Sequence, residues 1–160
     1  MTAELPTPAQ LGEILLADEA ATGRLGRAIA GVLGHGEAVC LEGPLGAGKS
    51  TLARALVRAL TTPDEDVPSP TFTLVQFYEG PRLSVAHFDL YRLTSPDEAY
   101  EIGLDEALED GAAVIEWPGR LEGRLPADRL DIEIDIEGDA RRARLTGHGA
   151  WKGRRLELGS

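Results

Sequence analysis

An α/β fold is the architecture that this sequence predicts, and three observations lead to it. A short apolar run at residues 38–41 is typical of a buried strand, and it leads through a glycine-rich loop into residues 51–60, whose apolar side chains recur at helical spacing. Two more strand-like runs, residues 73–78 and 83–90, flank a turn and predict an antiparallel hairpin. A chain of 160 residues is long enough for a core, so we expect residues 1–160 to form a single domain.

The composition is that of an ordinary globular protein, with 42% hydrophobic and 27% charged residues. No apolar stretch approaches a membrane span, and the N-terminal residues lack the basic and apolar regions of a signal peptide. We therefore expect a cytoplasmic protein without a membrane partner. The net charge of −11 argues against a protein that wraps nucleic acid by itself. Cys40, the single cysteine, is expected to be a buried core residue.

The segment before the loop predicts one amphipathic helix. Residues 1–16 are weakly patterned and suit a short strand or a turn. Residues 18–34 carry an apolar stripe at helical spacing, with Asp18 as a suitable N-cap and glycines at the end.

The loop itself, residues 43–51, matches the phosphate-binding pattern G-x-x-x-x-G-K-[ST]. Its glycines let backbone N–H groups approach phosphate oxygens, and the following helix points its partly positive N-terminus at the same anion. Lys49 is suited to reach the β- and γ-phosphates, and the Ser50 hydroxyl to ligate Mg²⁺. Because the flanking strand and helix also match, we favour a nucleoside triphosphate site over a glycine turn that only caps a helix.

A polar loop at residues 61–68 precedes a segment in which two prolines stiffen the backbone around serine and threonine hydroxyls. Within it, Thr71 is suited either to position water and sense a γ-phosphate or to cap its own turn. The predicted hairpin then ends in Asp89, a candidate to ligate a Mg²⁺-bound water or orient water, with a turn cap as the alternative. Another apolar strand, residues 112–116, ends in Glu116. The two acids compete for the role beside the metal.

The remaining pattern predicts helices and then strands. They are a helix from Ser95 as N-cap, with Pro96 first and Glu98 completing a capping box, to Ile102; a helix over 104–108; an alternating strand over 131–137; a strand over 141–146; and a short strand over 151–158. The basic C-terminal segment, residues 141–160, holds six basic residues and one acid in an otherwise acidic chain. It is either a docking surface or a solvated edge strand whose arginines deter aggregation.

Four stretches, taken in order, resemble the TsaE family, also called YjeE. These are small bacterial P-loop ATPases needed for the threonylcarbamoyl modification of adenosine 37 in tRNA. The resemblance covers most of residues 15–145 and rests on Thr22 with residues 41–51, on Ser-Pro-Thr-Phe at 69–72, on His-Phe-Asp-Leu-Tyr-Arg-Leu at 87–93 and on Ile-Glu-Trp-Pro at 115–118. It implies a P-loop NTPase-like, three-layer α/β domain with a mixed, partly antiparallel sheet flanked by helices.

The same resemblance implies a weak ATPase that uses Mg²⁺ and acts with TsaD-like and TsaB-like proteins, meeting tRNA only indirectly. Carried over by motif position, the catalytic residues are Asp89, Lys49, Glu116 and Thr71. The nucleotide-binding residues are Leu45, Gly46, Ala47, Gly48, Lys49, Ser50, Thr51, Thr22 and Trp117. The metal ligands are Ser50 and Glu116. The resemblance further suggests that residues 69–72 form a first switch and that Trp117 is a lid residue.

Two other functions remain open from the sequence. A small-molecule or nucleotide kinase shares the loop, with Arg120 and Arg124 as the only candidates for a lid arginine. A non-catalytic nucleotide-dependent switch would need Lys49 but not Asp89. We interpret His87 as a hydrogen-bonded core histidine rather than a metal ligand, and Trp117 equally as a packing residue or a stacking one. The lack of an Asn-Lys-x-Asp motif favours ATP over GTP. The sequence leaves open the oligomeric state of the free protein and whether binding or hydrolysis does the work.

Overall fold

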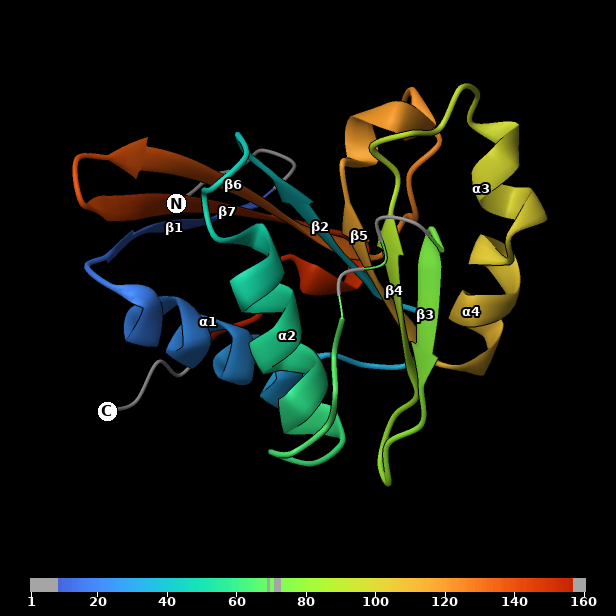
Figure 1. The fold of residues 1–160 in the computed structure, drawn as a ribbon, viewed down its shortest axis with the longest axis horizontal. Coiled ribbons are helices and arrows are strands. Elements are labelled where there is room, and N and C mark those ends of the chain that lie inside the picture. Colours follow the sequence, from blue (N-terminus) through green and yellow to red (C-terminus); the bar gives the residue numbers. More distant parts are fainter. Residues whose placement is uncertain (1–8, 69, 71–72, 157–160) are drawn as a thin grey trace.

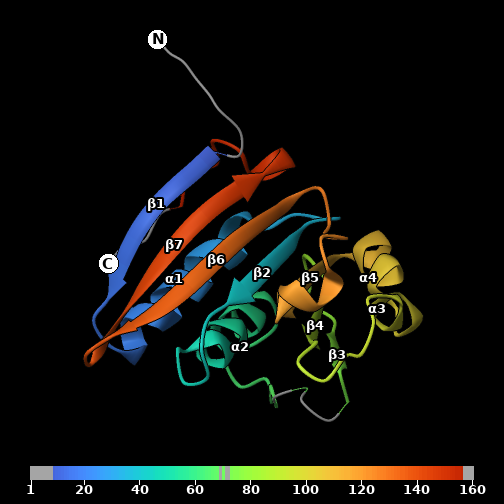
Figure 2. The ribbon, with the colours of Figure 1, turned by 90° about the horizontal axis from the view of Figure 1, so that it is seen from above.

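A computed structural model describes residues 9–68, 70 and 73–156, and these form one seven-stranded mixed sheet (Figure 1). Its strands lie in the order β1-β7-β6-β2-β5-β4-β3, as Figure 2 shows from above. Their bounds are β1 Ala9–Leu16, β2 Ala38–Glu42, β3 Val75–Tyr78, β4 Val85–Asp89, β5 Ala112–Glu116, β6 Arg129–Glu137 and β7 Ala140–His148.

The sheet is parallel at its centre and antiparallel at both sides. Strands β6, β2, β5 and β4 run parallel, whereas β1 and β7 pair antiparallel, as do β7 with β6 and β3 with β4. The predicted hairpin is therefore confirmed. The carboxyl ends of the parallel strands meet at one edge, which is where α/β folds place their ligands.

Helices cover both faces of the sheet, which confirms the three-layer α/β prediction. Their bounds are α1 Glu19–Val32, α2 Lys49–Leu60, α3 Asp97–Glu101 and α4 Leu104–Asp110, with 3₁₀ turns η1 Pro118–Leu121 and η2 Gly149–Trp151. One apolar core lies between the sheet and α1 with α2, and a second lies between the sheet and α3, α4 and η1. Cys40 is buried in the second core, as predicted.

Helix α1 begins where the sequence predicted, because the carboxylate of Asp18 accepts a hydrogen bond from the Ala21 N–H at 2.9 Å. It packs closely along α2 at Gly26, where a Cβ would lie 2.7 Å from the backbone oxygen of Leu52. A larger residue there would force the two helices apart.

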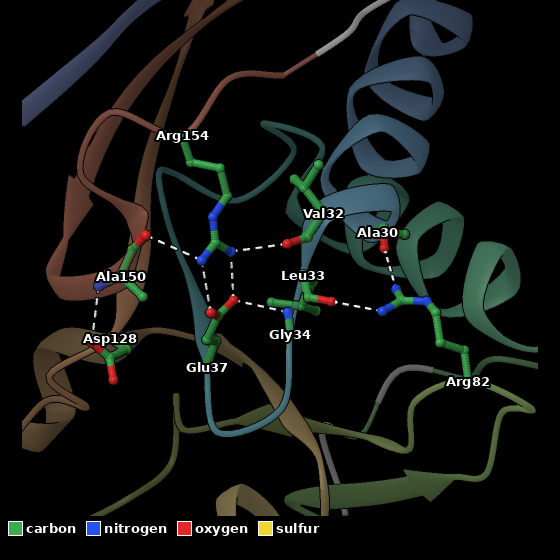
Figure 3. Close-up of polar contacts among 9 residues, drawn as sticks. All are labelled: Ala30, Val32, Leu33, Gly34, Glu37, Arg82, Asp128, Ala150 and Arg154. Carbon is green, nitrogen blue, oxygen red and sulfur yellow. Dashed lines mark hydrogen bonds and ion pairs between the residues drawn. The ribbon is translucent and has the colours of Figure 1, made fainter.

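Two arginines satisfy carbonyl groups at the C-terminal end of α1 (Figure 3). Arg82 donates to the carbonyls of Ala30 and Leu33. Arg154 donates to Val32 O at 2.8 Å and forms two hydrogen bonds with the Glu37 carboxylate at 2.7 and 2.8 Å. Glu37 in turn accepts from the Gly34 N–H. Cations at the C-terminus of a helix also complement its dipole, so this network secures the end of α1.

Two local predictions are wrong, and one alternative is excluded. Ser95 is not the N-cap of α3, because Pro96 takes that position without a side-chain cap, although Glu98 Oε1 does accept from the Ser95 N–H. The strand expected over 151–158 is instead η2 followed by irregular backbone to residue 156, and the rest lies outside the described residues. The alternative that the basic C-terminal segment forms an edge strand is excluded, because β1 pairs with β7 and takes the edge position.

None of the helices in the described part of the chain is both long and apolar enough to cross a membrane.

Candidate nucleotide-binding site

The glycine-rich loop leaves β2 at Glu42 and ends where α2 begins at Lys49. Gly43, Gly46 and Gly48 all have positive φ angles, of 151°, 84° and 102°. A Cβ at Gly43 would also collide with the backbone oxygen of Ile134. The conformation therefore depends on glycine, and it leaves the first N–H groups of α2 without intrahelical acceptors. This is the cradle that an anionic group needs.

Lys49 lies at the centre of the site and is only 5% exposed. Its Nζ donates to the carbonyl oxygen of Gly43 at 2.6 Å and lies 3.5 Å from the centre of the Trp117 ring. Burial lowers the pKa of Lys49 below its ordinary value, while the negative charges of Glu116 and Asp89 oppose that shift. The ammonium group is thus buried, and its positive charge is favoured by the nearby acids.

The two acids singled out by the sequence lie side by side. Asp89 ends β4 and Glu116 ends β5, and the parallel register pairs one directly with the other. Both are buried, at 6% and 3% exposure. Glu116 extends Oε1 toward the Ser50 hydroxyl at 3.5 Å, while Asp89 accepts a hydrogen bond from the Tyr91 N–H at 3.1 Å. Both acids therefore face the same cleft as the glycine-rich loop.

His87 lies behind Glu116 in the core, 1% exposed, with its Nε2 2.7 Å from Glu116 Oε2. The interpretation of His87 as a core histidine is confirmed. Its contact fixes one carboxylate oxygen of Glu116 and leaves the other facing Ser50.

These groups open into one cleft of about 390 Å³ at the carboxyl ends of the central strands. Every predicted site residue in the described part of the chain lines it: Thr22, Leu45, Gly46, Ala47, Gly48, Lys49, Ser50, Thr51, Asp89, Glu116 and Trp117. Thr71 and the other residues of the predicted first switch, apart from Pro70, lie outside the described residues. Trp117 packs against Tyr91 with ring centres 4.8 Å apart and also lines the cleft.

Sequence reasoning missed five residues of the cleft wall: Leu16, Asp18, Glu19, Asp139 and Arg141. Arg141 is the most informative of them, because its Nη2 donates a hydrogen bond to the Gly46 carbonyl at 3.0 Å and so stabilises the conformation of the glycine-rich loop. The basic C-terminal segment was the available signal, but nothing in it pointed to the loop. The other arginines of strand β7 pair with acids elsewhere, Arg142 with Glu137 and Arg144 with Glu133.

The candidate lid arginines do not line this cleft. Arg124 forms an ion pair with Asp97, and the guanidinium of Arg120 lies 5.6 Å from the centre of the Tyr91 ring. Nothing in their placement favours the kinase alternative.

The donor set suits Mg²⁺ bound together with phosphate. Within the described residues, no group of three or more His, Cys, Asp or Glu side chains could hold a metal ion alone. A hydroxyl and a carboxylate are nevertheless the hard oxygen donors that Mg²⁺ takes when phosphate and water complete its shell. Ser50 and Glu116 are such a pair.

Comparisons with known proteins agree on one family. A family model described as threonylcarbamoyl adenosine biosynthesis protein TsaE matches residues 16–144. The chain is similar to proteins named tRNA threonylcarbamoyladenosine biosynthesis protein TsaE: 40% identical to that of Nostoc sp. over 91% of this chain and 92% of the relative, and 39% identical to that of Aquifex aeolicus over 84% and 96%. A crystal structure of YdiB from Bacillus subtilis aligns with a TM-score of 0.74 at 28% identity, covering 91% of this chain and 90% of the other.

Proposed function

Because this chain belongs to the TsaE family of threonylcarbamoyl adenosine biosynthesis proteins, we propose that it binds and hydrolyses ATP in the service of tRNA threonylcarbamoyladenosine formation. The observation that carries the ATPase part is the convergence of a phosphate loop, a buried lysine and two buried carboxylates on one cleft. A glycine turn that only caps a helix would require neither the buried lysine nor the two buried carboxylates.

In this proposal the loop recognises the triphosphate. The N–H groups of the loop and of the first turn of α2 hydrogen-bond phosphate oxygens, and the helix dipole adds attraction. Lys49 contacts the outer phosphates, which requires its ammonium group to exchange the Gly43 carbonyl for a phosphate oxygen. Its present position between Gly43 and Trp117 keeps the cation within the cleft and ready for that exchange.

Ser50 and Glu116 are the proposed Mg²⁺ ligands. The ion, when bound, neutralises charge that develops on the phosphate oxygens during transfer. The chain's contribution is to hold Glu116, through its contact with His87, so that Oε1 faces the Ser50 hydroxyl.

Asp89 is the proposed residue that orients the attacking water. It occupies the neighbouring strand end and lines the same cleft, at the register position beside Glu116. A carboxylate there can accept a proton from water as the γ-phosphoryl group is transferred to it. Thr22 from α1 and Trp117 from the end of β5 complete the proposed contacts with the nucleotide.

The proposed partners are TsaD-like and TsaB-like proteins, and the chain meets tRNA only through them. A net charge of −11 supports a protein contact over direct tRNA binding, because the phosphate backbone of RNA would be repelled. The chain would gate the partners' chemistry rather than perform the modification.

Two measurements test the proposal. Purified protein should hydrolyse ATP slowly in the presence of Mg²⁺, and gel filtration should show association with the TsaD–TsaB pair that depends on the nucleotide. Asp89→Asn should retain ATP binding and lose hydrolysis. Efficient phosphoryl transfer to a small acceptor would instead identify a kinase, and full function of Asp89→Asn in tRNA modification would identify a non-catalytic switch.

A further inference from the structure

The outer surfaces of α1 and α2, which lie side by side in Figure 1, enclose a second groove of about 620 Å³. Three arginines, Arg27 from α1 and Arg54 and Arg58 from α2, line it together with one acid, Glu19, and with small apolar side chains. The latter are Ala20, Ala55 and Ala59. Three cations in one groove are unusual for a chain with net charge −11.

No carboxylate within the described residues forms an ion pair with these three arginines. Arg124, Arg129, Arg142, Arg144 and Arg154 each form an ion pair with an acid of the chain. Arg58 donates a hydrogen bond from its Nε to the carbonyl of Glu65. Its two terminal nitrogens form no hydrogen bond or ion pair with the other described residues. Three arginines against one glutamate leave the groove with a net positive charge.

We propose that this groove is a docking site for an acidic, extended segment of a partner protein. Arg54 and Arg58 are one helical turn apart, about 6 Å along the axis. Alternate side chains of an extended strand lie about 6.6 Å apart on one side. A Glu-x-Glu sequence therefore matches the two guanidinium groups, and Arg27 faces the same space from the other helix. Recognition of acidic motifs by arginine clusters follows the same chemistry.

A protein segment fits better than nucleic acid for two reasons. Small methyl groups between the cations suit peptide side chains, whereas a phosphate backbone gains from a longer basic track. The body of the protein is acidic, and it would repel a long polyanion more strongly than a short acidic peptide.

The docking site adjoins the nucleotide cleft. Glu19 and Thr51 line both cavities, and Thr51 directly follows Ser50 on α2. The inference itself does not depend on ATP binding, since it uses only the surface of the two helices.

Fluorescence anisotropy with a labelled peptide of alternating glutamate and alanine tests the docking site on the full chain. We expect the peptide to bind wild-type protein, with an affinity that falls as salt rises, and the matched glutamine–alanine peptide not to bind. The double variant Arg27→Glu, Arg54→Glu should weaken binding by at least about tenfold. Arg24→Glu, which makes the same charge change per substitution on an exposed residue of α1 outside the groove, should change it by less than about twofold.

Circular dichroism and thermal melting of each variant establish that the fold is retained. Failure of the acidic peptide to bind, or equal binding to wild type and double variant, would overturn the proposal. So would tighter binding of oligouridine of equal charge that the same double variant abolishes, because the groove would then be a nucleic-acid site. Each result is independent of ATP hydrolysis, so it leaves the proposed function to its own tests.

Discussion

The imidazole of His87 and the carboxylate of Glu116 are in contact inside the core, with 2.7 Å between Nε2 and Oε2. They lie on neighbouring parallel strands, β4 and β5, and both are almost wholly buried. Since the second carboxylate oxygen faces Ser50, this pair links the core to the proposed metal position. Outer partners of this kind tune a site as much as its ligands do.

His87 is therefore expected to act as a positioning residue for Glu116. His87→Leu should lower Mg²⁺-dependent ATP hydrolysis by about tenfold or more and raise the Mg²⁺ concentration needed for half-maximal rate. His87→Gln, which keeps an amide donor, should recover part of the loss. A purely structural role would lower thermal stability in both variants without moving the Mg²⁺ dependence, and that outcome would contradict the assignment.

Lys49 is expected to be essential for nucleotide affinity. Lys49→Ala removes the only lysine in the cleft, and calorimetric titration should show ATP affinity lower by at least about tenfold. Lys152→Ala is the matched control, because Lys152 is the chain's only other lysine and is exposed on the surface. Equal affinity of the two variants would rule out the proposed contact with phosphate.

Arg141 is expected to contribute to the same affinity by a different route. Its hydrogen bonds to the Gly46 carbonyl order the loop before nucleotide arrives, so Arg141→Ala should weaken ATP binding by about three- to tenfold. Arg142→Ala makes the same charge change one residue later, on the opposite side of β7, where the side chain pairs with Glu137. If both variants weakened binding equally, the effect would come from net charge and not from the loop.

The network of Arg154 and Glu37 is expected to stabilise the end of α1 (Figure 3). Arg154→Ala should lower the free energy of unfolding by about 2 kcal/mol at neutral pH, as measured by urea denaturation. Arg155→Ala, which alters the exposed neighbouring arginine, should have little effect. A stability loss shared by both variants would argue against a specific role of the ion pair.

The contribution of this pair also depends on pH. Burial alone would raise the pKa of Glu37, but hydrogen bonds from Arg154 and from the Gly34 N–H outweigh it and hold that pKa below the ordinary 4.5. A carboxyl with a lowered pKa in the folded state stabilises above its unfolded pKa, and this stabilisation is lost as pH falls through the folded value. The stability gap between wild type and Arg154→Ala should therefore be complete at neutral pH and narrow below about pH 4.5. A gap that stayed constant down to strongly acidic pH would contradict the linkage.

Local patterns in the sequence were enough to predict much of the site. The conformation of the loop at residues 43–51 depends on its own glycines, and Asp18 caps α1 through a hydrogen bond to a residue only three positions later. Asp89 and Glu116 were singled out because each ends an apolar strand of the sequence. Their direct pairing follows from β4 and β5 being parallel neighbours.

The features that the sequence could not predict depend on contacts between distant segments. Arg141 meets Gly46 across 95 residues, and Arg154 meets Glu37 across 117. Arg141 lies on β7 and Arg154 follows η2, so both contacts require the C-terminal part of the chain to fold back against segments far away in the sequence. No periodicity in residues 9–16 indicates which strand they pair with. The position of β7 between β1 and β6 could therefore not be predicted.

The most direct test of the central claim is reconstitution of tRNA threonylcarbamoyladenosine formation with TsaD-like and TsaB-like proteins, measured as modified nucleoside over repeated turnovers. We expect sustained modification only when this chain and ATP are both present, and loss of it with Lys49→Ala but not with Lys152→Ala. Full modification without the chain, or with Lys49→Ala in its place, would show that the proposed function is wrong.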